Sequence, residues 1–542
     1  MVEFGDILKA VGEFGRFQKW LVLLICIPNF LTPFHIFGQQ FIVMDVLHYC
    51  KTNWLHGLNL TQEQELNLTI PKKPDGSLEE CRMYTPVQED LESILKYGLN
   101  ATEKCQSGWV YPETSKPTLL TEFNLVCDQK DLHDISQSIF MAGLLVGALV
   151  FGPLSDRIGS RWSILLQLLL MGCFGVGSGF APTFAVYIIL RFVVGAAFAG
   201  ISISMAALTS EWVGAAYRPL AQVTTHCSNA LGQMALAGLA YSIHDWRKYQ
   251  VAGSAPVFVL FFYIWVLPNS ARWLVTKGKI EEAKQLLRKA ASINKRTVPE
   301  ELLNQMAPEE KVKSGSVLDL FKMPHLRRTT LIMIWVWFAD SLVYYGVSLH
   351  VGDFGLDIYM TQLIFGAVEI PARFSCVFLL QWLGRKKCQA AWLLLGGIVC
   401  LFIPVVPKDF PVIVTILAVI GKSSLAASFS TSYVFSSEVF PTVVRQTGLG
   451  LCSMAARVAG ILSPLVGLLD KIHPAIPMSL LGATALIGGV LCFFLPETRD
   501  KDLQDDTNVK STSSVRSNKV VNGWTEQKED GQITESTKST YF

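Results

Sequence analysis

Charged side chains are scarce in this chain: they make up 17% of its 542 residues, whereas 51% of the residues are hydrophobic. The mean hydropathy is +0.37. A soluble protein of this length has a more polar composition, so these values indicate a membrane protein with several spans. The two signs of charge nearly cancel, leaving a formal net charge of +2. That balance indicates neither nucleic acid nor acidic partners.

Motifs for catalysis and cofactor binding are also lacking. The sequence has no phosphate-binding glycine loop, no ligand spacing of a zinc site and no nucleophile elbow. We therefore expect no enzymatic activity, no cofactor and no metal, and energy for any transport from a solute gradient. The amino terminus lacks a cleavable signal pattern, because the apolar run from Trp20 is long and has no small-residue end. We expect that run to be a first membrane helix.

Apolar segments of spanning length recur along the chain, and a bilayer core takes about 20 apolar residues. They fall six and six around a polar stretch at 268–328 that holds thirteen Lys and Arg residues. We predict an all-α membrane protein whose twelve spans are 19–43, 135–155, 162–181, 186–209, 219–241, 248–267, 329–350, 358–383, 389–408, 411–436, 447–469 and 476–495.

The predicted domains follow from these spans. They are a cytosolic amino terminus (1–18), an amino-terminal half (19–267) that includes an extracellular domain (44–134), a cytosolic linker with helices (268–328), a carboxy-terminal half (329–495) and a disordered cytosolic tail (496–542). Two halves of six helices are typical of transporters built from repeats. Within the linker, 279–292 is rich in helix formers, which predicts a helix.

Basic residues and glycosylation signals give the same topology. The linker and the short loops at 156–161 and 384–388 are basic, which places them and both termini in the cytosol. Three N-x-T sequons, at Asn59, Asn67 and Asn100, place the 44–134 region outside. We therefore expect a glycoprotein that contacts membrane lipid along all its spans.

Four of the twelve cysteines, Cys50, Cys81, Cys105 and Cys127, fall in that extracellular region. Cysteines beside sequons indicate an oxidising compartment and two disulfides. The sequence allows three pairings, of which a nested one, Cys50 with Cys127 and Cys81 with Cys105, is a guess.

The chain ends Ser539-Thr540-Tyr541-Phe542. A Ser or Thr two positions before a hydrophobic carboxy terminus can add as a strand to a PDZ-type groove, so Thr540 and Phe542 indicate a PDZ-domain partner. An incidental tail end is the alternative.

Charged residues gather at turns that the topology places on the cytosolic side. Gly152-Pro-Leu-Ser-Asp156-Arg157-Ile-Gly159-Ser160-Arg161 resembles the G-x-L-x-D-R-x-G-R loop of the major facilitator superfamily, with Ser160 in place of the usual base. Glu211 and Arg218 bracket the turn after the fourth span, and Glu438 and Arg445 repeat that spacing in the second half. The resemblance implies that these charges are gates, whose cytosolic ion pairs hold the outward-open state. Capping of helix ends is the alternative. The residues concerned are Asp156, Arg157, Arg161, Glu211, Arg218, Glu438 and Arg445.

Further motifs narrow the resemblance. Pro268-Asn-Ser-Ala-Arg272-Trp-Leu274 is similar to the P-E-S-P-R-W-L segment of the organic ion transporters of solute carrier family 22, with Asn269 and Ala271 as departures. Arg445-Gln-Thr-Gly448 and Leu495-Pro-Glu-Thr498 fit as well, and the match covers about residues 1–500. Within that family the chain resembles the organic anion transporters, and among these it is most similar to an exchanger of urate, nicotinate and orotate. The resemblance implies antiport against intracellular organic anions at the plasma membrane, on the apical side of an epithelium.

Arg457 lies near the middle of 22 residues, Gly448 to Leu469, that hold no other charge. A guanidinium at that depth costs about 2.5–3.5 kcal/mol on insertion scales, so it needs a partner. Arg373 and Lys422 lie at similar depth, as do two acids. Glu369 and Arg373 have the i, i+4 spacing of a pair, and Lys422 can pair with Asp340. Arg457 is then the unmatched cation and attracts an anionic substrate. For Arg373 and Lys422, internal pairing alone is an equal alternative.

Aromatic residues of the predicted spans can complete such a site, because ring faces suit planar substrates by offset stacking. The candidates are Tyr241, Tyr344, Tyr345, Phe429 and Tyr433. Packing alone is the alternative for each. Resemblance adds that cation transporters of the family carry an acid where Arg457 stands.

We therefore expect a secondary active organic anion exchanger that works by alternating access. An organic cation or zwitterion transporter of the same fold, using Asp340 or Glu369, is the nearest alternative. A receptor that binds a partner through its extracellular domain is another.

Overall fold

The computed structural model describes residues 4–53, 60–74, 76–87, 91–112, 116–306, 316–407, 409–441 and 443–499. Asn59, most of the predicted tail, and Thr540 and Phe542 of the predicted PDZ motif lie outside these residues.

The expected twelve spans are present in the described chain. Ten segments form helices long and apolar enough to cross a membrane. The other two are α10 (Arg218–Ser242), which is more polar, and the shorter apolar α23 (Ile476–Cys492). The remaining spans are α2 (Arg16–Ile36) with α3 (Gln39–Ile42), α7 (Leu132–Ile158), α8 (Ser160–Ser178), α9 (Phe184–Trp212), α11 (Trp246–Ser254) with α12 (Pro256–Val259) and α13 (Tyr263–Val266), α18 (Pro324–Leu349), α19 (Ile358–Leu383), α20 (Arg385–Phe402), α21 (Pro411–Val439) and α22 (Arg445–Gly467).

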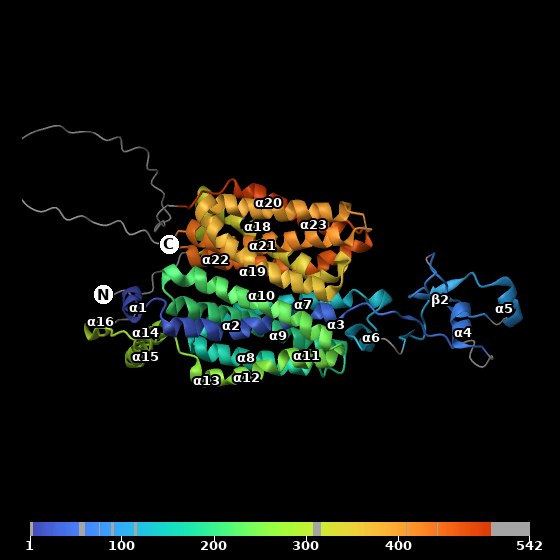
Figure 1. Cartoon of the computed structure of the whole chain (residues 1–542), viewed down its shortest axis with the longest axis horizontal. Coiled ribbons are helices and arrows are strands. Elements are labelled where there is room, and N and C mark those ends of the chain that lie inside the picture. Colours follow the sequence, from blue (N-terminus) through green and yellow to red (C-terminus); the bar gives the residue numbers. More distant parts are fainter. Residues whose placement is uncertain are drawn as a thin grey trace, which may run out of the picture.

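The spans form two groups that lie side by side (Figure 1). One group holds α2 and α7 to α13, and the other holds α18 to α23. Contacts of α10 with α19 and of α7 with α22 join them. Both groups contain a sharp turn at a glycine with positive φ, Gly159 after α7 and Gly384 after α19 (φ 91° and 87°). The repeated turn supports a fold built from two related halves.

Two spans of the amino-terminal half approach closely. A Cβ on Gly143 or Gly147 of α7 would collide with backbone oxygens of Phe192 and Ala196 on α9. Small residues at such positions let membrane helices pack backbone to backbone.

One end of the bundle carries α1 (Phe4–Val11) and the linker helices, and we call it the linker end (Figure 1). Those helices are α14 (Ala271–Thr276), α15 (Ile280–Ile293), α16 (Glu300–Asn304) and α17 (Val317–Lys322). Helix α15 confirms the helix predicted at 279–292. Asn294, after α15, accepts a hydrogen bond from the amide of Phe17 (2.8 Å) and donates to Val11 and Gln18. The linker therefore holds the amino-terminal segment against the bundle.

The other end carries a small domain before α7, which we call the disulfide domain (Figure 1). Its helices are α4 (Gln62–Thr69), α5 (Leu91–Tyr97) and α6 (Leu119–Phe123). Strand β1 (Tyr49–Cys50) pairs antiparallel with β4 (Trp109–Val110), and β2 (Arg82–Tyr84) with β3 (Thr102–Lys104). Asn67 and Asn100 are both exposed in this domain, as glycosylation requires.

The disulfide domain holds two disulfides, but the guessed nested pairing is wrong. Cys50 bonds Cys105, with Cα atoms 5.1 Å apart, and Cys81 bonds Cys127, with Cα atoms 5.6 Å apart. Contacts between β1 and β2 bring the first strand beside the β2–β3 pair, so Cys50 meets the cysteine that follows β3. Spacing along the chain carries no information on that arrangement of strands.

Candidate functional site

A cavity of about 370 Å³ lies between the two halves. Its walls come from α2, α7, α9 and α10 on one side and from α18, α19, α21 and α22 on the other. It reaches toward the linker end, where Thr209 and Gln222 line it close to the turn between α9 and α10. The bundle is therefore hollowed from mid-depth toward the linker end.

The opposite end of the bundle is closed above this cavity. Tyr359 at the start of α19 stacks on Phe41 of α3, with ring centroids 5.5 Å apart. Tyr241 packs edge-on against the same Tyr359 at 5.6 Å. Lys471 after α22 forms an ion pair with Asp131 just before α7, which joins the two halves.

Two arginines, Arg373 and Arg457, are the only Asp, Glu, Lys or Arg residues among the described lining residues. Both positions were predicted from the sequence. The guanidinium of Arg457 donates to the carbonyl of Leu144 on α7 at 3.2 Å. No carboxylate of the described chain forms an ion pair with it. Arg457 is thus a cation at the cavity wall that donates to a neutral carbonyl across the interface of the halves.

Glu369 of α19 is the centre of a buried network beside the cavity. Its carboxylate pairs with Lys422 of α21 at 3.0 Å and with Arg373 at 3.3 Å, and both side chains of the Lys422 pair are fully buried. It also accepts hydrogen bonds from Tyr344 (2.7 Å) and from Gln233 of α10 (3.2 Å). The predicted Glu369–Arg373 pair is confirmed, and α19 remains continuous across Pro371 between them.

The predicted pairing of Lys422 with Asp340 is wrong. Lys422 also donates to Ser348 and lies 3.9 Å from the ring centroid of Tyr344. Asp340 accepts hydrogen bonds from Ser428, Ser432 and Gln389. These neutral donors, two from α21 and one from α20, solvate its carboxylate, while Lys422 on α21 pairs with α19.

Three cations and two carboxylates lie at or beside this part of the cavity. Arg373, Lys422 and Arg457 contribute three positive charges, and Glu369 and Asp340 contribute two negative charges. The excess is positive, and the low effective dielectric of a membrane interior strengthens its action on a mobile ion.

Four of the five predicted aromatic residues line the cavity: Tyr344, Tyr345, Phe429 and Tyr433. Tyr344 and Tyr345 meet edge to face at 5.3 Å, and Phe429 lies 6.1 Å from both Tyr344 and Tyr433. The fifth, Tyr241, is 67% exposed at the disulfide end of α10 and lies outside the cavity lining. Tyr241 packs instead against Tyr359 at the closed end of the bundle.

Two further aromatic residues of the wall were missed. Trp337 of α18 packs on Tyr433 at 4.5 Å and on Phe429 at 6.0 Å. Phe37 lies 6.5 Å from Tyr345 and 5.0 Å from the Lys422 ammonium. Phe37 lies at the break between α2 and α3, which the single predicted span over 19–43 did not include. For Trp337 we find no signal in the sequence. His226, Asn229 and Gln233 on the polar helix α10 were missed as well, although the low hydropathy of that span marks it.

The predicted gate charges lie at the linker end. In the carboxy-terminal half, Arg385 forms a bidentate pair with Glu438, both bonds at 2.9 Å, and Thr498 donates to the same carboxylate. Arg445 donates to the carbonyl of Phe440. The partner of Glu438 was thus missed, although the basic loop at 384–388 was noted.

The amino-terminal half differs at the matching turn. Ser160 follows Gly159 where Arg385 follows Gly384, and one carboxylate oxygen of Glu211 has no hydrogen-bond partner. Glu211 is instead neighboured by Ser270 and Arg272. The remaining predicted gate residues form no ion pair with one another in the described chain. Arg161 donates to the carbonyl of Ile264, and Arg218 donates to the carbonyl of Val213. The backbone carbonyl of Asp156 accepts from Trp273, and Arg157 lies in the last turn of α7.

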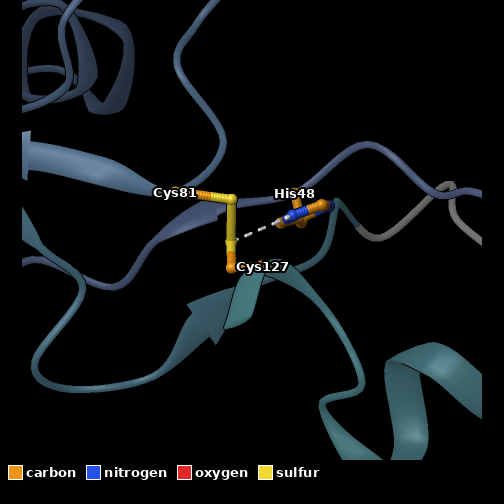
Figure 2. A group of neighbouring side chains, drawn as sticks. All are labelled: His48, Cys81 and Cys127. Carbon is orange, nitrogen blue, oxygen red and sulfur yellow. Dashed lines mark hydrogen bonds between the residues drawn. A yellow bond between two sulfur atoms is a disulfide. The ribbon is translucent and has the colours of Figure 1, made fainter. Parts of the chain in front are cut away.

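His48, Cys81 and Cys127 of the disulfide domain lie together (Figure 2). The two sulfurs are bonded to each other, and the Nε2 atom of His48 lies 3.8 Å from the sulfur of Cys127. A disulfide offers no thiolate to a metal, so this group is a structural contact.

Known proteins share this sequence and this fold. The sequence family described as "Sugar (and other) transporter" matches residues 99–508. Human "Solute carrier family 22 member 13" is 51% identical over 509 residues, covering 93% of this chain and 92% of that protein. Human "Organic anion transporter 3" is 37% identical over 525 residues, covering 95% of each.

Among solved structures, the E. coli xylose transporter XylE in a partially occluded inward open conformation is similar to this chain with a TM-score of 0.60 at 15% identity. The match covers 90% of this chain and all of that one. At that identity the likeness shows the fold alone, and the sequence matches decide the family. This chain belongs to solute carrier family 22, a family of multi-pass membrane transporters with the major facilitator superfamily fold.

Proposed function

We propose that this transporter exchanges small aromatic or heterocyclic anions across the plasma membrane by alternating access. The single observation that carries the proposal is the cavity wall, which presents Arg373 and Arg457 and no described carboxylate. A guanidinium binds a carboxylate through two parallel hydrogen bonds, so Arg457 is the residue we assign to the anionic group of the substrate. The names of relatives such as organic anion transporter 3 agree with that assignment.

The burial of the acids argues against a cation or zwitterion transporter. Asp340 and Glu369 are both fully buried, and neither lines the cavity. Their oxygens are already engaged, Asp340 by three neutral donors and Glu369 by two cations and two neutral donors. A cationic substrate would meet two arginines and no accessible acid.

The aromatic wall determines the preferred shape of the substrate. Tyr344, Tyr345, Phe429, Tyr433 and Trp337 surround the space beside the arginines. Ring pairs contribute about 0.5–1.5 kcal/mol beyond their buried area, which favours planar substrates. Urate, nicotinate and orotate, the substrates that the sequence resemblance implies, combine a planar ring with one negative charge.

Exchange follows from the lack of an acid partner for Arg457 in the described chain. Closing an empty cavity around its guanidinium would desolvate a charge without compensation, which costs several kcal/mol. An anion bound on each crossing compensates the charge, so an intracellular organic anion should return as each substrate anion enters. In the proposed orientation the linker end and both termini are cytosolic and the disulfide domain is extracellular. Apical placement and a PDZ partner at Thr540 and Phe542 belong to the same proposal.

The role of Arg457 is tested by two substitutions in cells. Arg457→Asp should abolish uptake of radiolabelled urate, nicotinate and orotate, because the sign of the charge is reversed. Arg457→Lys keeps the charge but loses a bidentate bond worth about 1.5–3 kcal/mol, so its KM should rise roughly ten- to a hundredfold. Surface biotinylation controls for expression. Normal uptake by the Asp variant at equal surface amount would refute the assignment.

Exchange is tested by preloading. Cells loaded with an organic anion should take up labelled substrate faster than depleted cells, because the return step of a loaded cavity is faster. Equal rates in the two conditions would contradict an obligatory counter-anion, while leaving the assignment of Arg457 intact.

A further inference from the structure

A second buried arginine lies outside the transport cavity, inside the amino-terminal half. Arg191 of α9 is 2% exposed. One of its terminal nitrogens donates to the carbonyl of His35 (2.8 Å) and to the side-chain oxygens of Gln39 (3.4 Å) and Gln137 (3.5 Å). Its guanidinium also lies 4.3 Å from the ring centroid of Phe140. These partners are neutral, and no described carboxylate forms an ion pair with Arg191.

Several polar atoms around Arg191 are buried without a hydrogen-bond partner. They are the Nε atom of Arg191 itself, both ring nitrogens of His35, and the hydroxyls of Tyr187 and Tyr249. His35, Tyr187 and Tyr249 are at most 2% exposed. Tyr187 lies one turn before Arg191 on α9, and the backbone of His35 accepts a hydrogen bond from Arg191. The Tyr249 hydroxyl lies beside Gly38, the residue before the Arg191 partner Gln39. Native interiors seldom leave a buried polar group unpaired, and here Arg191 and three residues near it carry five such atoms.

The chemistry of these atoms favours an anion over a neutral ligand. A guanidinium Nε can only donate a hydrogen bond, phenol hydroxyls can donate, and a neutral imidazole donates from one nitrogen. The cluster therefore presents donors around one uncompensated positive charge. A water molecule would satisfy some donors but leave the charge, whereas an acceptor-only anion satisfies both the donors and the charge.

We propose that this cluster, formed by Arg191, His35, Tyr187 and Tyr249, is a second anion site that binds chloride. Its enclosure by α2, α7, α8, α9 and α11 restricts it to a monatomic inorganic anion rather than an organic carboxylate. His35 lies against Gly175 of α8, and the Tyr249 hydroxyl lies 2.7 Å from the position that a Cβ on Gly38 would take.

The position of the site connects it to transport. Gly38 and Phe37 form the break between α2 and α3, and Phe37 lines the transport cavity beside Lys422 and Tyr345. A chloride held behind this break fixes the segment that presents Phe37. The site differs from the organic anion site at Arg457, which lies at the interface with the other half.

The test uses the purified full-length transporter without substrate. Its unfolding midpoint is measured while chloride replaces gluconate at about 150 mM total salt, which holds ionic strength constant. A ligand that binds only the folded state stabilises it by mass action, so the midpoint should rise saturably by about 1 °C for each kcal/mol of binding free energy. Because no transport is measured, this result is separate from the exchange proposal.

Variants assign the effect to the site. The double variant Tyr187→Phe and Tyr249→Phe keeps both rings but removes two donors, so the chloride-dependent shift should disappear. Tyr263→Phe is the matched control, since Tyr263 is equally buried in the same half but its hydroxyl already donates to Leu24. Tyr263→Phe and Arg457→Ala should both keep the shift. Should the double variant misfold, each single variant should raise the chloride concentration for half-maximal shift severalfold.

Three results would overturn the proposal. They are a wild-type midpoint independent of chloride, as expected for a site filled by water, a full shift in the double variant, and loss of the shift in Arg457→Ala alone. As an independent measurement, crystals grown with bromide should show an anomalous scattering peak beside the Nε atom of Arg191. Absence of that peak in an otherwise ordered bromide crystal would also count against the site.

Discussion

Glu369 balances two buried cations at once, Lys422 and Arg373, and accepts from Tyr344 and Gln233 as well. Removal of one partner from a buried ion pair typically destabilises a protein by about 3–5 kcal/mol, because a charge is left uncompensated. We therefore expect Glu369→Gln to lower the unfolding midpoint of the purified protein by several degrees, with loss of uptake.

Asp340→Asn is the matched control for this prediction. Asp340 is also fully buried in the same half, but its partners Ser428, Ser432 and Gln389 are neutral, and no cation depends on it. An amide keeps an acceptor oxygen at this position, so the midpoint should fall by much less. An equal fall of the midpoint in the two variants would show that the destabilisation comes from replacing a buried carboxylate. It would then not come from leaving two cations without their partner.

Pairs of charged residues were predictable from the sequence where both residues lie on the same helix. Glu369 and Arg373 are four residues apart on α19, so their pairing needs no knowledge of neighbouring helices. The partner of Lys422 depends instead on how α18, α19 and α21 are rotated about their axes. That rotation cannot be predicted from apolar spans that lack a clear polar face. Arg457 stood out because no other charge shares its span, and that depends on composition alone.

Helical elements were predictable to the extent that length and composition define them. The twelve spans and the linker helix were found, because apolar runs and helix formers are local signals. The sixth span is less regular than expected, since Pro256 separates α11 from α12 and a further turn precedes α13. The disulfide domain was the poorest case, because its fold depends on how two short two-stranded sheets pack.

The observed disulfides make a prediction about paired substitutions. Cys50→Ser with Cys105→Ser removes one bond and leaves Cys81–Cys127 intact. Cys50→Ser with Cys127→Ser breaks both bonds and leaves two unpaired thiols. Loss of one disulfide from a small extracellular domain costs about 2–5 kcal/mol, so the second double variant should reach the cell surface in much smaller amounts than the first. Equal surface amounts would contradict the observed pairing.

The asymmetry between the two linker-end turns leads to another prediction. Arg385 begins α20 and forms a bidentate pair with Glu438, whereas Ser160 begins α8 and Glu211 keeps an unpartnered oxygen. Because the two halves repeat the same turn, Ser160→Arg should place a guanidinium beside Glu211. A partly buried bidentate pair contributes on the order of 1 kcal/mol, so the unfolding midpoint should rise by about 1 °C.

Two controls separate the ion pair from side-chain length. Ser160→Gln extends the side chain without charge and should give no comparable rise. Ser160→Arg combined with Glu211→Gln should lose the gain, because the added arginine then has no carboxylate. A rise that persists in the combined variant would show that the arginine acts elsewhere.

For the whole molecule, closure at the disulfide end and the cavity toward the linker end define one conformation of an alternating-access cycle. The halves meet at mid-depth through contacts that a rocking motion must break, including Arg457 with Leu144 and Gln233 with Glu369. Arg457 and Glu369 therefore link the two halves, and Arg457 is also the residue that we propose binds the substrate anion. Substrate bound at Arg457 would replace the carbonyl of Leu144, so occupancy and movement of the halves are expected to be coupled.

The ion pair of Lys471 with Asp131 should bias that conformational equilibrium. It joins the two halves at the closed end, with 56% and 33% of the side chains exposed. Exposed pairs contribute about 0.2–1 kcal/mol, so Lys471→Ala should raise the fraction open at the disulfide end by at most roughly fivefold. A cysteine introduced at Ser453, which lines the cavity, reports this fraction through its rate of modification by a membrane-impermeant maleimide.

The charge swap Asp131→Lys with Lys471→Asp should restore the original rate of modification, because the ion pair re-forms with its signs exchanged. Lys104→Ala is the matched control, since the Lys104–Asp128 pair at 2.8 Å is also exposed but lies within the disulfide domain. An unchanged rate in Lys471→Ala, or an equal increase in Lys104→Ala, would show that this pair does not hold the two halves together.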